Sequence, residues 1–391
     1  MKFNKWTLGL AAVGVVSLAS AARADEKVSQ LNTALSNTTL SGYVDVGAQY
    51  VNAGGATYST IGAGDSFSLN TVDIALDKPL DATPFSAGYH IELWAGAGAT
   101  APGPLGPTDG SLIRQAYLAL GTTVGGQEID WKIGVWDTII GYEGLTSANN
   151  PNYTHSYGFA IEPTTHTGIL GTYKINDDIS IEAGVADDSV TGGAYTAVIN
   201  GAGGSGGTLH HPTLMGAIAL TAPDSFGPMK GATLTIGGMN TADPTGGFGD
   251  SLYAGVTVPT PISALKFGGA FDYYEAGNGK VAGVGGHVWV AGVYGSYQAT
   301  DKLSFNVRGE TFDEDGFIAF LPGLNPATGT GHGEEFTATV QYALWANVLS
   351  RVELRWDHAD DASPFTPNTG RIPAGKVSNP VLLAAQLIYT F

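Results

Sequence analysis

The sequence predicts an all-β fold: a transmembrane antiparallel β-barrel of about 16 strands (14–18), with long outer loops and short periplasmic turns. Three observations predict it. Polar and apolar residues alternate with period two from residue 40 onward, the breaks between the alternating segments are sorted by length, and the last segment ends on an aromatic residue, Phe391. A soluble β-sandwich also alternates, but it has no reason to place its long loops on one side.

The alternating segments supply the strands. In 303–310, for example, apolar Leu303, Phe305 and Val307 occupy one face, and polar residues such as Asn306 and Arg308 occupy the other. Most segments are about 8–12 residues long, which is what a tilted strand needs to cross a bilayer. We expect strands near 40–51, 66–79, 86–96, 112–121, 128–136, 167–174, 179–187, 213–222, 232–239, 249–258, 264–274, 287–298, 303–312, 335–344, 348–357 and 381–391.

The connections between these segments favour a membrane barrel. Odd-numbered strands are followed by long loops, and even-numbered strands by tight turns such as 122–127 and 345–347. We expect this alternation to be strict, with both chain ends on the periplasmic side. The long loops are 52–65, 97–111, 137–166, 188–212, 313–334 and 358–380.

The N-terminus has the features of a cleaved signal peptide. Lys2 and Lys5 precede a nearly uncharged apolar stretch, and Ala22-Arg23-Ala24 fits the small-x-small cleavage pattern. The alternative, an N-terminal membrane anchor, lacks length and a stop-transfer flank. We expect three parts: a signal peptide at 1–24, a short periplasmic segment at 25–39 with Val28, Leu31 and Leu35 at helical spacing, and the barrel at 40–391.

Charge and composition exclude several classes of protein. The 17 Lys and Arg residues oppose 35 Asp and Glu residues, a net charge of −18 that cleavage would change to −21 by removing Lys2, Lys5 and Arg23. An excess of acid excludes a nucleic-acid-binding protein, which needs a basic surface for phosphate contacts. The chain has 0 Cys residues, so disulfides, thiolate nucleophiles and Cys-ligated zinc are excluded as well.

A resemblance becomes specific within residues 133–175. The blocks Gly141-Tyr142-Glu143, His155-Ser156-Tyr157 and Thr165-His166-Thr167-Gly168 stand on one long loop and at the start of the strand after it. In this respect the chain resembles the beta-barrel porin-2 family, also called OmpL-like, and shorter likenesses at 42–45, 114–117 and 351–356 extend over nearly all of the mature chain. The resemblance implies an outer-membrane porin; it implies no particular substrate.

Loop 137–166 is the candidate pore constriction. Loops of about 30 residues are uncommon and are usually functional or disordered. In trimeric 16-stranded porins the third outer loop folds inward, and 137–166 is the third outer loop here. The alternative is a loop packed over the barrel mouth with its acids in water. The expected constriction residues are Asp137, Glu143, His155, Glu162 and His166.

The wall opposite that loop is expected to carry charged side chains. Inward folding would bring Glu143 or Glu162 within reach of arginines across the pore, and the resulting field would favour polar solutes. The expected lumen-wall residues are Arg114, Lys132, Arg308, Glu310, Arg351, Glu353 and Arg355. At the chain end, Tyr389 and Phe391 resemble the aromatic C-terminal signal that the barrel assembly machinery reads.

The expected function is an outer-membrane porin, exported through the Sec pathway, for passive diffusion of small hydrophilic solutes and ions. We expect no catalytic, cofactor or metal site, and partners limited to solutes, outer-membrane lipids, lipopolysaccharide and the assembly machinery, with a homotrimer left open. The alternatives are an outer-membrane barrel enzyme, either lipase-like or protease-like, and a substrate-specific channel. Barrel enzymes usually have about 8–12 strands, and neither His90 with Glu92 nor His358 with Asp357 has a convincing third partner.

Overall fold

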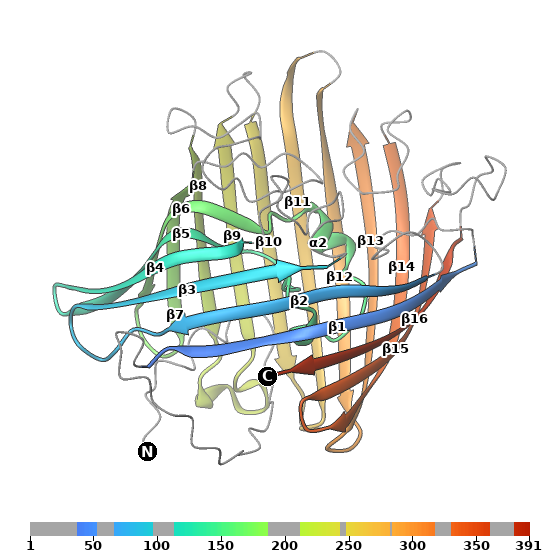
Figure 1. Cartoon of the computed structure of the whole chain (residues 1–391). Helices are drawn as coiled ribbons and strands as arrows, with labels where there is room; N and C mark the ends of the chain where they lie inside the picture. The colour runs from blue at the N-terminus through green and yellow to red at the C-terminus, as the bar shows by residue number, and fades with distance from the viewer. Residues whose placement is uncertain are drawn as a thin grey trace.

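The computed structural model describes eight stretches of the chain: residues 37–52, 66–96, 113–186, 212–242, 248–281, 284–316, 330–359 and 379–391. They form one barrel (Figure 1). The expected signal peptide 1–24 and most of the expected periplasmic segment 25–39 lie outside the described residues.

Sixteen strands make up the sheet. The first eight are β1 (Thr39–Val51), β2 (Ser66–Lys78), β3 (Ser86–Ala95), β4 (Ile113–Val124), β5 (Gln127–Asp137), β6 (Thr165–Lys174), β7 (Ile179–Ala186) and β8 (Thr213–Thr221). The second eight are β9 (Thr233–Ala242), β10 (Phe248–Pro259), β11 (Leu265–Val281), β12 (Val284–Gln298), β13 (Leu303–Gly316), β14 (Thr330–Trp345), β15 (Val348–Ala359) and β16 (Val381–Thr390).

The sheet closes because β1 pairs antiparallel with β16. In that pairing Val44 lies opposite Tyr389. Backbone hydrogen bonds join Gly42 N to Phe391 O at 3.1 Å and Phe391 N to Gly42 O at 3.0 Å. Every strand pairs with its neighbours in the sequence, so closure leaves no strand with an unpaired edge. The predicted 16-stranded antiparallel barrel is confirmed.

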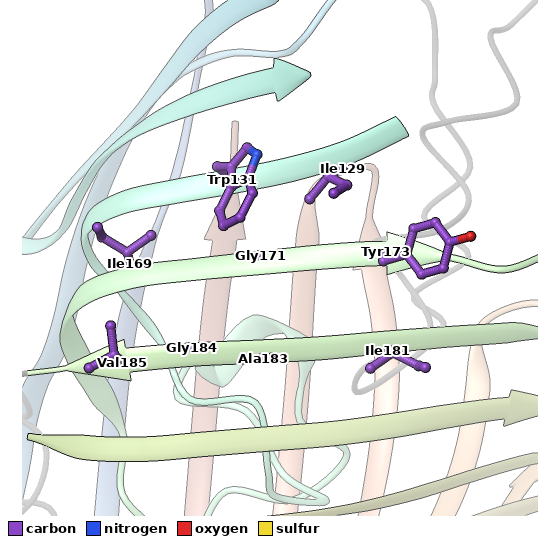
Figure 2. Close-up of a pocket in the computed structure, with 9 residues that line it drawn as sticks. All are labelled: Ile129, Trp131, Ile169, Gly171, Tyr173, Ile181, Ala183, Gly184 and Val185. Atoms are coloured by element: carbon purple, nitrogen blue, oxygen red, sulfur yellow. The ribbon is translucent and has the colours of Figure 1, made fainter. Parts of the chain in front are cut away.

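Alternation sorts side chains between the lumen and the outer surface. On β13, Arg308 is fully buried, whereas its neighbour Val307 is 44% exposed. In a soluble protein the apolar side chains are buried and the polar ones are exposed. Here the exposed face is apolar and the buried face is polar, as a membrane barrel requires. On the outer face of β5, β6 and β7, Gly171 and Ala183 form the floor of a shallow apolar groove (Figure 2). Its rim is made by Ile129, Trp131, Ile169, Tyr173, Ile181 and Val185.

The predicted strict alternation of connection lengths is wrong in three places. β11 and β12 extend beyond the predicted strands until only residues 282–283 separate them, and only 243–247 separate β9 from β10. On the other side, residues 222–232 between β8 and β9 form an 11-residue connection that includes the 3-10 helix η5 (Asp224–Met229). The glycines at 277 and 279 hid the continuation of β11, because glycine is depleted in strands and interrupts the alternation.

Two short helical segments lie between β5 and β6: the 3-10 helix η3 (Ser147–Asn149) and α2 (Tyr157–Ile161). Ser156 caps α2, since its hydroxyl accepts a hydrogen bond from the backbone N–H of Phe159 at 3.0 Å. No helix among the described residues is long and apolar enough to cross a membrane.

Candidate functional site

Residues 138–164, which we call the lumen loop, leave β5 and pass into the interior of the barrel before they return to β6 (Figure 1). The loop reaches the far wall, where α2 packs against β11 and β12. Tyr153 packs with Val51, Leu382 and Ala384 of β1 and β16. Leu145 and Phe159 pack on Trp94 of β3. Every residue from 152 to 166 is buried, so the loop is enclosed by the wall rather than laid over the mouth.

The Arg308 side chain of β13 forms ion pairs with one carboxylate of the loop and one carboxylate of the neighbouring strand. Its Nη1 donates to Glu143 of the loop at 2.7 Å, and its Nε donates to Glu335 of β14 at 2.8 Å. The same guanidinium also donates to the backbone oxygens of Thr154, at 2.8 Å, and His155, at 3.2 Å. Both carboxylates and the guanidinium are buried away from water. Each charge is therefore stabilised by its oppositely charged neighbours instead of by hydration.

Arg355 of β15 holds the next turn of the loop. Its Nη1 donates to the carbonyl oxygen of His155 at 2.6 Å, and its Nη2 donates to Asp357 at 2.8 Å. Asp357 in turn accepts a hydrogen bond from the hydroxyl of Tyr157 at 2.6 Å. The guanidinium lies over the Tyr157 ring, 5.1 Å from its centroid. A side chain of α2 is thereby fixed by both a cation–π contact and a charged hydrogen bond.

Backbone groups of the loop are bound by further charged side chains of the wall. Glu353 accepts hydrogen bonds from the N–H groups of Tyr153, at 2.5 Å, and Thr154, at 3.0 Å. Glu310 accepts one from the N–H of Tyr157 at 2.6 Å. Arg351 donates to the carbonyl oxygen of Ser147 at 2.8 Å and also to that of Asn150. These bonds satisfy backbone groups that irregular structure would otherwise leave unpaired inside the barrel.

Glu162 contacts another carboxyl group instead of a cation or a backbone amide. It is 4% exposed, and its carboxyl group is hydrogen-bonded to that of Asp272 on β11, which is 3% exposed. Gly141 packs directly on the Glu162 carboxyl with φ +118, a conformation that favours glycine. A Cβ atom at Gly158 would lie 2.6 Å from Asp272 Oδ2. Two glycines of the loop therefore make room for this carboxyl pair.

Apolar contacts fix the opposite side of the loop. Ile139, Ile140, Ala160 and Ile161 pack against inward side chains of β6 to β13. That wall contributes Leu170, Ala186, Met215, Met239, Tyr253, Tyr274, Val288, Val290 and Phe312. A pore wall lined by water would not need these residues, so this part of the lumen is packed like a protein core.

The two glutamates of the loop differ in their proton affinity. Burial by itself raises the pKa of Glu143, but the Arg308 guanidinium and the hydrogen bond with His155 outweigh burial and lower that pKa to about 2. Burial, and then repulsion by Asp272, raises the pKa of Glu162 well above its ordinary value. The surroundings therefore favour the carboxylate form of Glu143 and the protonated form of Glu162.

A second charged cluster lies on β3, β4 and β5. Arg114 occupies a β-bulge, since Glu92 pairs with Gln115 and the next residue of β3 pairs with Ile113. The guanidinium donates to Glu92 and to Asp137, at 2.5 Å in each case. The Asp137 side chain is 41% exposed, while that of Arg114 is 7% exposed. Arg114 was expected on the lumen wall; the bulge interrupts the alternation of β4 at this residue, and its side chain is buried.

The structure brings most of the predicted residues together. Glu143 and His155 meet in the loop at 3.2 Å, and Arg308, Glu310, Arg351, Glu353 and Arg355 line the wall that holds it. Glu143 reaches Arg308 as expected. Of the two glutamates expected near an arginine, Glu143 makes that contact, whereas Glu162 lies against Asp272. Asp137, Lys132 and His166 stay at the β5–β6 side, where His166 is fully buried next to Thr138 at 3.2 Å.

Sequence reasoning missed the carboxylates that complete these contacts. Glu335, Asp357 and Asp272 each stand on a polar strand face, and all three are buried. For Asp272 the signal was present, because this acid stands between two aromatic residues in Phe271-Asp272-Tyr273, whereas Glu335 follows another acid and Asp357 precedes a histidine. Among the described residues, no group of three or more acidic or histidine side chains is arranged to hold a metal ion.

Comparison with known proteins then assigns the family. The model of the family described as "Putative beta-barrel porin-2, OmpL-like" matches residues 37–391. The chain belongs to this family. The family and the fold place it among porin-type channels of the Gram-negative outer membrane. No curated protein matches the sequence.

Solved structures share the fold at low sequence identity. An anion-selective porin from Comamonas acidovorans is 15% identical, with a TM-score of 0.57 over 90% of this chain and 99% of that one. The outer-membrane channel DcaP of Acinetobacter baumannii is 15% identical, with a TM-score of 0.57 over 90% and 97% of the two chains. OmpF of Salmonella typhi, in complex with daunomycin, is 15% identical, with a TM-score of 0.56 over 90% and 97%.

Proposed function

We propose that this barrel is a channel for the passive diffusion of small hydrophilic solutes and ions, and that the lumen loop is its constriction. The observation that carries the proposal is the enclosure of the loop inside the barrel. The loop is fixed by ion pairs on one side and by apolar packing on the other, so it narrows the lumen in one defined position. A polar, charged interior exchanges the hydration of a passing solute for contacts with the wall.

The hydrated part of the lumen at this level is expected on the β3–β5 side. Along β2 to β5 the side chains of Asp137 and Asp77 are each 41% exposed and that of His90 is 18% exposed, in contrast to the fully buried Arg308 and Arg355 opposite. The loop also presents exposed Gly144 and Asn149. Solutes would therefore pass between these loop residues and the cluster around Arg114.

Planar-bilayer recording of the purified, folded protein tests the proposal. We expect stepwise conductance in KCl, with block by solutes that enter but do not pass. Absence of conductance, both in the whole chain and in a variant with a shortened lumen loop, would refute a diffusion channel. A preference for one solute class over others of the same size would instead favour the substrate-specific channel.

Charge favours cations as the preferred ions. Acids outnumber bases in the whole chain, and the half-exposed Asp137 stands where we place the aqueous path. We expect reversal potentials in a KCl gradient to show a modest cation preference that decreases as salt screens the wall charges. Asp137→Asn should reduce this preference. A preference for anions in the unmodified chain would contradict it.

The chain end supports an assembly signal. Tyr389 and Phe391 are each 47% exposed on the outer face and their rings stack, 6.4 Å apart between centroids. Exposed aromatic side chains there are available to an assembly partner before the barrel closes. We expect Phe391→Ala to lower the amount of folded protein in the outer membrane without changing single-channel conductance.

Cross-linking of the inserted protein would test whether it forms a homotrimer.

A further inference from the structure

The carboxyl pair between Glu162 and Asp272 differs from the ion pairs that Arg308 and Arg355 form with the loop and the wall. A hydrogen bond between two carboxyl groups needs a proton on one of them, because two carboxylates have only acceptors. Both groups are buried, and Asp272 Oδ1 accepts no hydrogen bond from any described residue. The contact between the loop and β11 therefore depends on a retained proton.

The surroundings of the pair make a second negative charge costly. Glu143 on the loop and Glu310 on β13 both repel charge on Glu162, and Tyr253 on β10 supplies a neutral hydroxyl group. Asp272 on β11 is the direct partner. Arg308, the arginine that contacts Glu143, is bound to Glu143 and Glu335 at 2.7 and 2.8 Å, and no arginine contact is made by Glu162 or Asp272 among the described residues. No described cation is left to neutralise a second carboxylate at this point.

The pair stands at the base of α2. Glu162 follows α2 directly, and the N–H of Glu162 donates to Gly158 O at 3.2 Å. Asp272 lies against Gly158 itself. Loss of the proton would thus place two buried carboxylates against each other where the helix rests on the wall, and their repulsion would push α2 away from β11.

We propose that Glu162 and Asp272 form a proton-dependent latch that holds the lumen loop in its narrowing position and releases it when the pair loses its proton at alkaline pH. This rests on the proposed function, since the loop must be a constriction for its release to change conduction. The raised pKa of Glu162 agrees with a latch that is closed at neutral pH. Once the pair titrates, each further pH unit changes the ratio of latched to released loop by about tenfold.

The test is single-channel conductance of the whole chain between pH 6 and about pH 10, with symmetrical KCl on both sides. We expect a reversible rise in conductance or in open-state noise above neutral pH. Glu162→Gln keeps a hydrogen-bond donor to Asp272 but cannot titrate, so we expect it to abolish the pH-dependent rise. Asp272→Asn should do the same from the other side of the contact.

Asp301→Asn serves as the matched control, because Asp301 is an exposed acid on the turn between β12 and β13. Its pH profile should follow that of the unmodified chain. Retention of the strand signal in circular dichroism checks that each variant is folded. A conductance that does not change with pH in the unmodified chain, or a rise that persists in Glu162→Gln, would overturn the latch. Absence of conductance at every pH would refute the proposed function instead.

Discussion

The lumen loop meets two walls of opposite character, and the comparison explains how an irregular segment keeps one position inside a wide barrel. The wall from β13 to β15 binds the loop with buried arginines and carboxylates, whereas the wall from β6 to β12 binds it with methionine, tyrosine and valine side chains. Apolar packing is non-directional and excludes water. Charged hydrogen bonds are directional and fix register. The apolar packing would be enough to keep the loop inside the barrel, and the hydrogen bonds and ion pairs of the charged side chains determine its position there.

Removal of the loop tests both walls together and has the largest expected effect. Deletion of residues 144–160 should raise single-channel conductance severalfold and relax size exclusion, because it takes away η3 and most of α2 together with their contacts. The barrel should still assemble, since the pairing of β5 with β6 is untouched. Unchanged conductance of correctly folded protein would show that the loop does not lie in the path of ions.

Loss of one charge tests the polar wall. Arg308→Met should destabilise the seated loop by about 3–5 kcal/mol, because it leaves Glu143 and Glu335 buried without a cation. We expect higher conductance and frequent switching between levels. Arg351→Met is the control: among the described contacts Arg351 binds backbone carbonyls and glutamine amides and no carboxylate, so its loss should have a clearly smaller effect. Equal effects of the two variants would contradict a special role of the Arg308 ion pairs.

A cavity tests the apolar wall. Ile161→Ala removes buried methyl groups from the cluster on β6 to β13 and should destabilise the seated loop by about 2–4 kcal/mol. The ion pairs still fix the loop position, so we expect more noise around an unchanged mean conductance. Ile133→Ala, on the outer face at 36% exposure, is the matched control and should leave the recordings as they are. A large rise in mean conductance in Ile161→Ala would mean that packing, not charge, sets the position.

Lowering the pH from 7 to 4 should have the smallest effect on conductance. The pKa of Glu143 lies at about 2, below the ordinary value of 4.5, so its contribution to loop stability is complete above pH 4.5 and is lost only as the pH falls through about 2. We therefore expect conductance to stay constant between pH 7 and pH 4. Recordings across that range in symmetrical KCl check it. Opening near pH 4.5 would mean that Glu143 is solvated rather than paired with Arg308.

The barrel could be predicted from the amino-acid sequence. Alternation with period two needs only local information, since each residue faces either the lumen or the lipid, and 16 such segments with an aromatic end define a closed sheet. The same alternation placed Arg308, Arg351 and Arg355 on the lumen face. It failed where local signals mislead: glycines concealed the continuation of β11, and the bulge at Arg114 interrupted the period of β4.

The contacts that hold the lumen loop could not be predicted from the sequence, because they depend on how the barrel closes. The contacts of Glu143 with Arg308 and of Tyr157 with Asp357 join residues 165 and 200 positions apart, and no periodicity relates positions so distant. The sequence offered either Glu143 or Glu162 as the partner of an arginine, because opposite charges attract, and the path of the loop brings Glu143 to Arg308 and Glu162 to Asp272. Burial then reverses the usual preference, because a shared proton costs less than two carboxylates without water. The sequence shows which residues carry charge. Which residue each of them contacts depends on the three-dimensional path of the loop and on which strands lie opposite it in the closed barrel.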